Sequence, residues 1–549
     1  MPHKVLLVGL DGATFDIVRP LAAQGRLPVI NDMMNRGAAG VLRSTIPPVT
    51  PSAWTTIFTG KNAGKHGIYD FQELEPDTYT FRTVRTDEHR EKTLWHLLDD
   101  VGKRSVIIDV PFTYPPKPLN GLMLTGYGTP RTDGTIFTFP EDFAGRLPPE
   151  LRSEVRVALP TNRFDRSARF IQEWEEVMAG RQRLLQYLIS AEPWDFFMVV
   201  FSITDNMAHV FWTYVDPAHP NYYRSEAEAY REAFFHGYQM CDRLLGELVE
   251  RAGKDTTTLV ISDHGFGSVR PRQYVYRRLL QGGYLRPKAA GGMPLGARLV
   301  RFAVDTYNRF PRLREWVKGL QPDNRTQLKQ SLQRTGIMPS EQSIDFARSR
   351  VIPSNFGLRM WINDDERFPQ GQVPAASRDA LLAELRDYLA QDRDAVTGRP
   401  IIANTYLGSE LYSGPHARNG PDLVIEYANL FDPEQHNPRR NPHVEGGHTL
   451  DGIFLAHGPA VAHNKPNATA KLTDIAPTVL HLLNLPVPPD MDGRVLQEIF
   501  DATYMRQNPA REGDKPARMA EKPASDIEKY SKSQEQELEE QFRQLGYID

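Results

Sequence analysis

Ligand-type side chains follow three apolar runs of the sequence. The runs are short and rich in β-branched or aromatic residues, which predicts buried strands. Aspartate and histidine, which follow them, are ligands that suit zinc, manganese and related divalent ions. Residues 4–10 end at Asp11, residues 195–203 run into Asp205 and His209, and residues 256–262 end at Asp263 and His264. His448, at the end of a Gly/Pro/Asn/His-rich loop, is a further side chain of this type.

Residues 44–71, STIPPVTPSAWTTIFTGKNAGKHGIYDF, add a hydroxyl group to this set. Their proline-rich start predicts a turn, and apolar residues at helical spacing then predict a short helix that stops at Gly60. Thr50 therefore stands at or just before a helix N-terminus, where unpaired N–H groups and the helix dipole suit a phosphate. Its hydroxyl is either a nucleophile or an N-cap. We expect Trp54, in the same stretch, to be a core residue rather than a surface for base stacking.

Six ligand-type side chains and one hydroxyl would serve two metal ions. Two ions about 3.5–4 Å apart stabilise the attacking and leaving oxygens of an in-line displacement at phosphorus. One of them would lower the pKa of the Thr50 hydroxyl and make it nucleophilic near neutral pH. We therefore expect two divalent ions, zinc or manganese, in a site for a small anionic phosphoester.

Each of these residues also has a structural explanation. The alternatives are a helix N-cap at Asp11 for residues 14–24, a surface pair formed by Asp205 and His209, a cap and a core histidine at Asp263 and His264, and a loop histidine at His448. The placement of all of them at strand ends favours the metal site, because ligands bind at the carboxyl edge of open α/β sheets.

Helical patterns alternate with the apolar runs, for example over 168–191 and 223–252. This alternation predicts an α/β fold with a doubly wound, mostly parallel sheet and helices on both faces. We expect four segments along the chain. They are the first part of a catalytic α/β core over 1–266, a basic insertion or lid over 267–350, the second part of the core over 351–503, and a charged, mobile tail over 504–549 with a short helix at 533–546.

The composition excludes several classes of protein. The 549 residues are 40% hydrophobic and 24% charged, which is typical of a globular protein, and the net charge of −4 gives no reason to expect nucleic-acid binding. A single cysteine, Cys241, forms no intramolecular disulfide. We find neither a signal-peptide pattern nor a transmembrane segment and expect a cytoplasmic protein.

The insertion is the most basic stretch of the chain. Residues 267–320 hold twelve Lys and Arg residues against two acidic ones, and 297–320 has the pattern of an amphipathic helix. One interpretation is a solvated basic helix packed on the domain. The other is an electrostatic funnel for an anionic substrate, or a weak contact with a membrane surface.

The ordered motifs LDG, TPSAW, TG, HG, DNMAH, SDHG and GGH resemble the alkaline phosphatase superfamily, and most of all its type I phosphodiesterase / nucleotide pyrophosphatase family. The resemblance spans about residues 4–500. It implies two zinc-type ions, with Thr50 as the nucleophile of a phospho-threonine intermediate. The implied ligands of one ion are Asp11, Thr50, Asp263 and His264, and those of the other are Asp205, His209 and His448.

Three readings of the function follow. The first is two-metal hydrolysis of phosphodiester or pyrophosphate bonds, and the second is phosphomonoester hydrolysis or phosphoryl transfer at the same site. The third is a non-hydrolytic, metal-stabilised adaptor, which the intact nucleophile and ligand set disfavour. A sulfatase is disfavoured too, because Thr50-Pro51-Ser52-Ala53 is not the Cys/Ser-x-Pro-x-Arg pattern of that branch.

Overall fold

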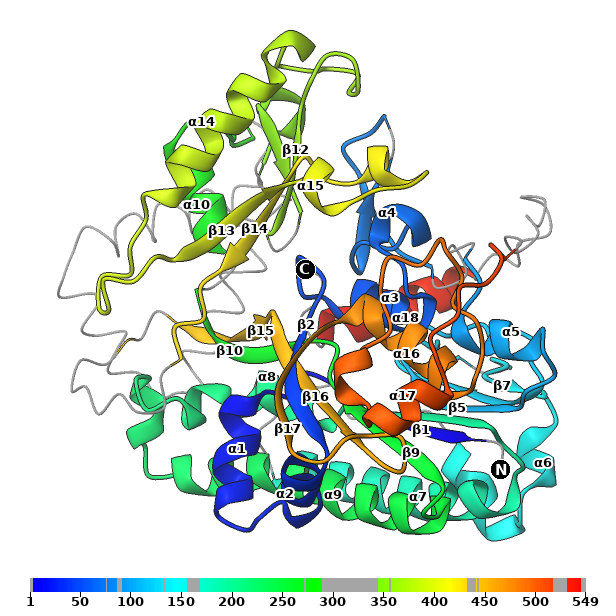
Figure 1. The fold of residues 1–549 in the computed structure, drawn as a ribbon. Coiled ribbons are helices and arrows are strands. Elements are labelled where there is room, and N and C mark those ends of the chain that lie inside the picture. The colour runs from blue at the N-terminus through cyan, green and yellow to red at the C-terminus, as the bar shows by residue number, and fades with distance from the viewer. Residues whose placement is uncertain are drawn as a thin grey trace.

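A nine-stranded sheet forms the centre of the molecule (Figure 1). The computed structural model describes residues 3–75, 77–85, 91–132, 134–155, 168–270, 273–288, 344–354, 357–431, 441, 444–516 and 531–544. In spatial order the strands of the sheet are β17 (Lys465–Lys471), β2 (Ala38–Arg43), β16 (Asp451–His457), β9 (Thr256–Ile261), β1 (Lys4–Leu10), β8 (Phe196–Phe201), β5 (Ser105–Val110), β6 (Gly121–Thr125) and β7 (Thr138–Phe139).

The middle of this sheet is parallel. Strand β1 pairs in parallel with β8 and β9, and β5 pairs in parallel with β8 and β6. Strands β16 and β7 run antiparallel to their neighbours. Because β8, β1 and β9 are adjacent and parallel, their carboxyl ends meet at one place on the sheet edge.

Helices cover both faces of the sheet, since alternate side chains of the buried strands point into two separate apolar cores. One face carries α1 (Phe15–Ala23), α2 (Pro28–Arg36), α7 (Ala168–Ala191), α8 (Ile203–Val215) and α9 (Ala227–Ala252). The other carries α3 (Thr50–Thr59), α5 (Leu94–Asp99), α16 (Ile475–Leu482) and α17 (Ala502–Gln507). The predicted doubly wound, mostly parallel α/β fold is therefore confirmed.

A second, smaller sheet lies above the carboxyl edge of the central sheet, as Figure 1 shows. Its four antiparallel strands, in spatial order, are β11 (Val351–Pro353), β12 (Arg359–Ile362), β14 (Leu423–Tyr427) and β13 (Ile402–Leu407). Helices α10 (Gln273–Gln281) and α14 (Arg378–Ala390) pack on it in a third apolar core.

The boundary expected at residue 350 differs from the structure. The strands after it, from 351 to 427, build the second sheet, and the central sheet resumes only with β16. Strand patterns give no information about which sheet a strand joins, because that choice depends on partners distant in the sequence. The proposed amphipathic helix at 297–320 and most of the basic insertion lie outside the described residues.

Buried ion pairs join the second sheet to the first part of the chain. The guanidinium of Arg359 on β12 lies 3.0 Å from an oxygen of Asp70 and 3.1 Å from Glu73, with all three side chains largely buried. Asp70 and Glu73 follow α4 (Ala63–His66), which comes shortly after α3. The second sheet is thereby fixed against the segment that carries Thr50.

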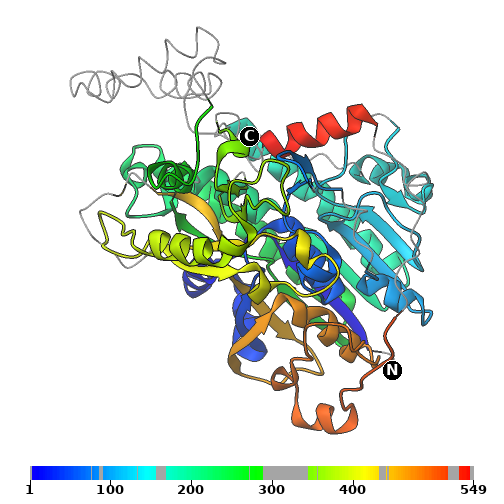
Figure 2. The same cartoon turned by 90° about the horizontal axis from the view of Figure 1, so that it is seen from above.

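The helix expected at 533–546 is present in the C-terminal segment, and it is docked on the core rather than part of a mobile tail. Helix α18 (Lys532–Gln544) packs beside the carboxyl ends of β5 and β6 (Figure 2). The Phe542 ring centroid lies 5.1 Å from that of Phe71 and 5.6 Å from that of Tyr127. The helix is rich in charged residues, and its two apolar side chains, Leu538 and Phe542, are both buried. A segment with so few apolar residues has the composition of a disordered tail, and the sequence alone therefore does not indicate docking.

No helix in the part of the chain described here is both long and apolar enough to cross a lipid bilayer.

Candidate metal centre

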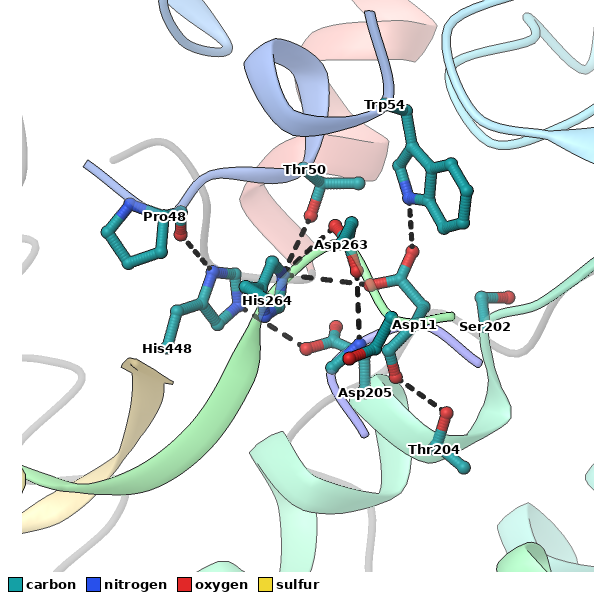
Figure 3. A network of polar contacts seen from close by, with 12 residues as sticks. Asp11, Pro48, Thr50, Trp54, Ser202, Thr204, Asp205, Asp263, His264 and His448 are labelled. Atoms are coloured by element: carbon teal, nitrogen blue, oxygen red, sulfur yellow. Dashed lines mark hydrogen bonds and ion pairs between the residues drawn. The ribbon is translucent and has the colours of Figure 1, made fainter. Parts of the chain in front are cut away.

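The adjacent ends of β1, β8 and β9 deliver the predicted carboxylates to one place. Asp11 follows β1 directly, Asp263 follows β9, and Asp205 lies in the first turn of α8, just after β8. All three are at most 3% exposed. Figure 3 shows them facing one another below the start of α3.

The remaining residues reach this place from outside the central sheet. Thr50 is the first residue of α3. His264 follows Asp263, and the chain continues into β10 (Gly265–Val269), which pairs with β15 (Glu445–Thr449). That pairing brings His448 beside His264, with the two rings stacked at a centroid distance of 3.7 Å.

One cluster surrounds the Nε2 atom of His264. This atom lies 3.4 Å from the Thr50 hydroxyl oxygen, 3.3 Å from Oδ2 of Asp263 and 3.7 Å from Oδ1 of Asp11. The four residues that the family resemblance assigns to one ion are thus adjacent.

A second cluster surrounds Oδ1 of Asp205. It lies 3.4 Å from Nε2 of His209 and 3.3 Å from Nε2 of His448, and the two ring nitrogens are 3.0 Å apart. Asp205 also reaches the first cluster, because it offers an oxygen within 4.8 Å of ligand atoms of Asp11 and His264. The structure therefore brings all seven predicted residues together.

Backbone carbonyls orient two of the imidazole rings. Nδ1 of His448 donates to the carbonyl of Pro48 at 2.9 Å, and Nδ1 of His264 donates to the carbonyl of Gly265 at 3.0 Å. A carbonyl oxygen only accepts, so the proton of each neutral ring is on Nδ1. Both Nε2 lone pairs are then available to a cation.

The buried carboxylates titrate abnormally. Burial raises the pKa of Asp11 well above its usual value, and the charges of Asp263 and Asp205 raise it further. Burial, followed by the charge of Asp205, raises the pKa of Asp263 to about 8. Burial also opposes ionisation of Asp205, but His209 and His448 outweigh it and hold the pKa of Asp205 below its usual value. These carboxylates repel one another, and a cation placed between them would stabilise them as anions.

The residues present fit metal ions. Oδ1 of Asp11 and Oδ2 of Asp263 are buried and have no hydrogen-bond partner among the described residues. Such atoms are costly to bury unless something positive pairs with them. With three imidazoles, they form the mixed oxygen and nitrogen donor set that zinc and manganese accept.

Three of the structural explanations are not supported, those for Asp11, for Thr50 and for the pair of Asp205 and His209. The N-cap of α1 is Thr14 rather than Asp11, and α3 begins after Val49 with no side-chain cap from Thr50. Asp205 and His209 are neighbours on a helix, as predicted, but Asp205 is 2% exposed and so the pair does not lie on the surface.

Several contacts around the ligands were not predicted from the sequence. The indole nitrogen of Trp54 donates to Oδ2 of Asp11 at 3.1 Å, and the backbone N–H of Gly12 donates to Oδ1 of Asp263 at 3.2 Å. Trp54 is fully buried, which agrees with its expected place in the core. It also contacts a predicted metal ligand, Asp11. No sequence pattern indicates the direction of an indole N–H.

A comparison with models of protein families agrees with the resemblance seen in the sequence motifs. The family model described as type I phosphodiesterase / nucleotide pyrophosphatase matches residues 5–430. No sequence of a curated protein matches the chain.

Two solved structures are similar to this chain over most of its length. Murine ectonucleotide pyrophosphatase/phosphodiesterase 5, as an inactive variant in complex with AMP, has a TM-score of 0.47 and 14% identity, over 91% of this chain and 100% of its own. Phosphonoacetate hydrolase from Sinorhizobium meliloti 1021, in complex with phosphonoformate, has a TM-score of 0.47 and 14% identity, over 88% of this chain and 95% of its own.

Proposed function

Because the chain belongs to the type I phosphodiesterase / nucleotide pyrophosphatase family, we propose that it is a metal-dependent hydrolase of phosphodiester or pyrophosphate bonds. Thr50 is the nucleophile in this proposal. Asp11, Thr50, Asp263 and His264 hold one divalent ion, and Asp205, His209 and His448 hold the other. The single observation that carries the proposal is the position of the Thr50 hydroxyl, 3.4 Å from Nε2 of His264 and beside two buried carboxylate oxygens that have no hydrogen-bond partner among the described residues.

The reaction proceeds in two steps. The oxygen of Thr50 loses its proton and attacks phosphorus, a bond from that oxygen to phosphorus forms, and the bond to the leaving alcohol or phosphate breaks. Water then attacks the phospho-threonine, the same bond to Thr50 breaks, and Thr50 regains its proton. Two divalent ions would supply Lewis acidity and stabilise the charge that develops on the transferring oxygens.

The start of α3 supports the binding of a phosphoryl group. The first N–H groups of a helix have no partners within the helix, and the dipole there is positive. Pro51 has no N–H, so Ser52 provides the nearest free backbone donor after Thr50. Ser52 is 3% exposed, and so water competes weakly for its N–H.

The charge of the site suits an anionic phosphoester. Two divalent ions would bring four positive charges against the three negative charges of Asp11, Asp205 and Asp263, which leaves an excess of one before Thr50 loses its proton. Phosphomonoester hydrolysis or phosphoryl transfer at the same site is the second candidate.

The test combines elemental analysis with turnover on the same preparation. We expect about two zinc-type or manganese ions per chain, and faster hydrolysis of bis(p-nitrophenyl) phosphate than of p-nitrophenyl phosphate. A chelator should abolish turnover, and added zinc or manganese should restore it. A higher kcat/KM on the monoester would favour the second candidate, and bound metal without turnover on either would favour an adaptor. Turnover that survives complete removal of metal would contradict all three.

A further inference from the structure

Each polar group of Asp11 except one carboxylate oxygen has a hydrogen-bond partner among the described residues. Its backbone N–H donates to the carbonyl of Phe201 at 3.0 Å, and its own carbonyl accepts from the hydroxyl of Thr204 at 2.6 Å. Its Oδ2 accepts from the indole nitrogen of Trp54 at 3.1 Å (Figure 3). Only Oδ1 has no hydrogen-bond partner among the described residues. This is the oxygen that faces Nε2 of His264, at 3.7 Å.

The position of the Trp54 ring depends on a glycine in the neighbouring strand. Trp54 is fully buried between α3 and β1. A Cβ atom built on Gly9 would lie only 2.4 Å from Cη2 of the indole and 2.9 Å from a methyl of Val200. The lack of a side chain at Gly9 therefore lets the ring lie against the strand that ends at Asp11.

Trp54 and Thr50 are one helical turn apart on α3. A single rigid element thus sets the position of the hydroxyl and of the indole N–H. Any shift of α3 relative to β1 would move both at once.

We infer that Trp54 is a positioning residue for the metal site. Its N–H fixes the Asp11 carboxylate with Oδ2 turned away, so that Oδ1 is presented to the ion that Asp11, Thr50, Asp263 and His264 would hold. The inference rests on the proposed function, because it needs a metal at this place. Partners of this kind orient ligands, and their loss commonly weakens metal binding 10- to 100-fold.

The test compares Trp54→Phe with Trp95→Phe. Both changes keep a large aromatic ring in the same apolar core, but Trp95 lies on α5, and its indole nitrogen has no hydrogen-bond partner in the described residues. Zinc affinity is measured for both variants and the wild type by competition with a chromophoric chelator. Stability to urea and the separate values of kcat and KM are measured on the same samples.

We expect Trp54→Phe to weaken one of the two zinc sites about 10- to 100-fold and to leave the other within about threefold of the wild type. Trp95→Phe should leave both sites unchanged, even if it lowers stability equally. The two changes are also compared in an Asp11→Asn background, where the indole has no carboxylate ligand to orient. There, adding Trp54→Phe should weaken zinc binding no more than adding Trp95→Phe does, because the indole would act on the metal site through Asp11 alone.

Other results would overturn the inference. Equal zinc affinity in the wild type and Trp54→Phe would show that the indole bond does not position the ligand. So would an undiminished effect of Trp54→Phe in the Asp11→Asn background. A wild type that binds no metal would reject the proposed function together with this inference, whereas a wild type with two ions and an unaffected Trp54→Phe variant would reject the inference alone.

Discussion

Nδ1 of His448 donates to the carbonyl oxygen of Pro48 at 2.9 Å, across 400 residues of sequence. Pro48 lies two residues before Thr50, so the segment that places the proposed nucleophile also orients an imidazole of the other cluster. His448 is in turn 3.3 Å from Asp205 through its Nε2 atom. The proposed nucleophile and the second cluster are therefore held by the same segment, and a displacement of residues 48–50 would disturb both.

Replacement of Thr50 by alanine should remove turnover and leave metal bound. Asp11, Asp263 and His264 remain to hold the ion, whereas no oxygen remains to attack phosphorus. We expect kcat to fall by about three orders of magnitude or more, with metal content near that of the wild type. Thr50→Ser is the matched control, because it keeps the hydroxyl and should retain measurable activity. Retention of most of the activity by Thr50→Ala would exclude Thr50 as the nucleophile.

His448→Ala should empty one metal site and spare the other. The change removes one of the three ligands Asp205, His209 and His448, while the ligands around Nε2 of His264 stay intact. Elemental analysis should find the metal content lowered from about two ions per chain towards one. His457→Ala, at the far end of β16, is the control and should not change it. Full metal content in His448→Ala would refute the assignment of this ligand.

His66 should make the protein sensitive to acid. Burial lowers the pKa of His66 to about 3, below its usual 6.5, and the neutral ring bonds to Thr56 and to the N–H of Ile68. Between pH 6.5 and 3 the unfolded chain binds a proton at this residue that the folded chain does not. The free energy of unfolding should therefore fall with decreasing pH across that range, by about 1.4 kcal/mol per pH unit from this group.

Urea unfolding at a series of pH values measures this slope. His66→Gln has no titrating group at the position and should lose this part of the slope, whatever its effect on stability near neutral pH. His463→Gln, which replaces an exposed histidine, serves as the control. A slope in His66→Gln equal to that of the wild type would mean that the buried ring does not titrate in this way.

The docked C-terminal helix should contribute to stability. Phe542 is 1% exposed and packs on Phe71 and Tyr127. Phe542→Ala should lower the free energy of unfolding by about 3–5 kcal/mol, by analogy with other buried phenylalanines. Glu535→Ala, an exposed position on the same helix, should change it little. Equal stability of the two variants to urea would indicate that α18 is not docked in solution.

The local pattern of apolar and polar residues predicted the strands of the central sheet and the carboxylates at their ends. The strand at residues 4–10 is apolar after Lys4 because it is buried on both faces, and its observed bounds are those expected. Asp11, Asp205 and Asp263 could be expected to meet because parallel strands present their carboxyl ends at one edge. The helix expected at 533–546 is present at 532–544. Its docking, and the joining of 351–427 into a second sheet, could not be predicted because both depend on which distant surfaces these segments contact.

The sequence by itself determined the types of ligand, their order along the chain and the alternation of strands and helices, since these follow from side-chain chemistry and periodicity. Only the tertiary structure decided which atoms face one another. The pairing of β10 with β15 brings His448 to His264, and the packing of α3 on β1 aims the Trp54 N–H at Asp11. Such contacts join residues far apart in sequence, and they are set by the packing of whole elements rather than by local preference.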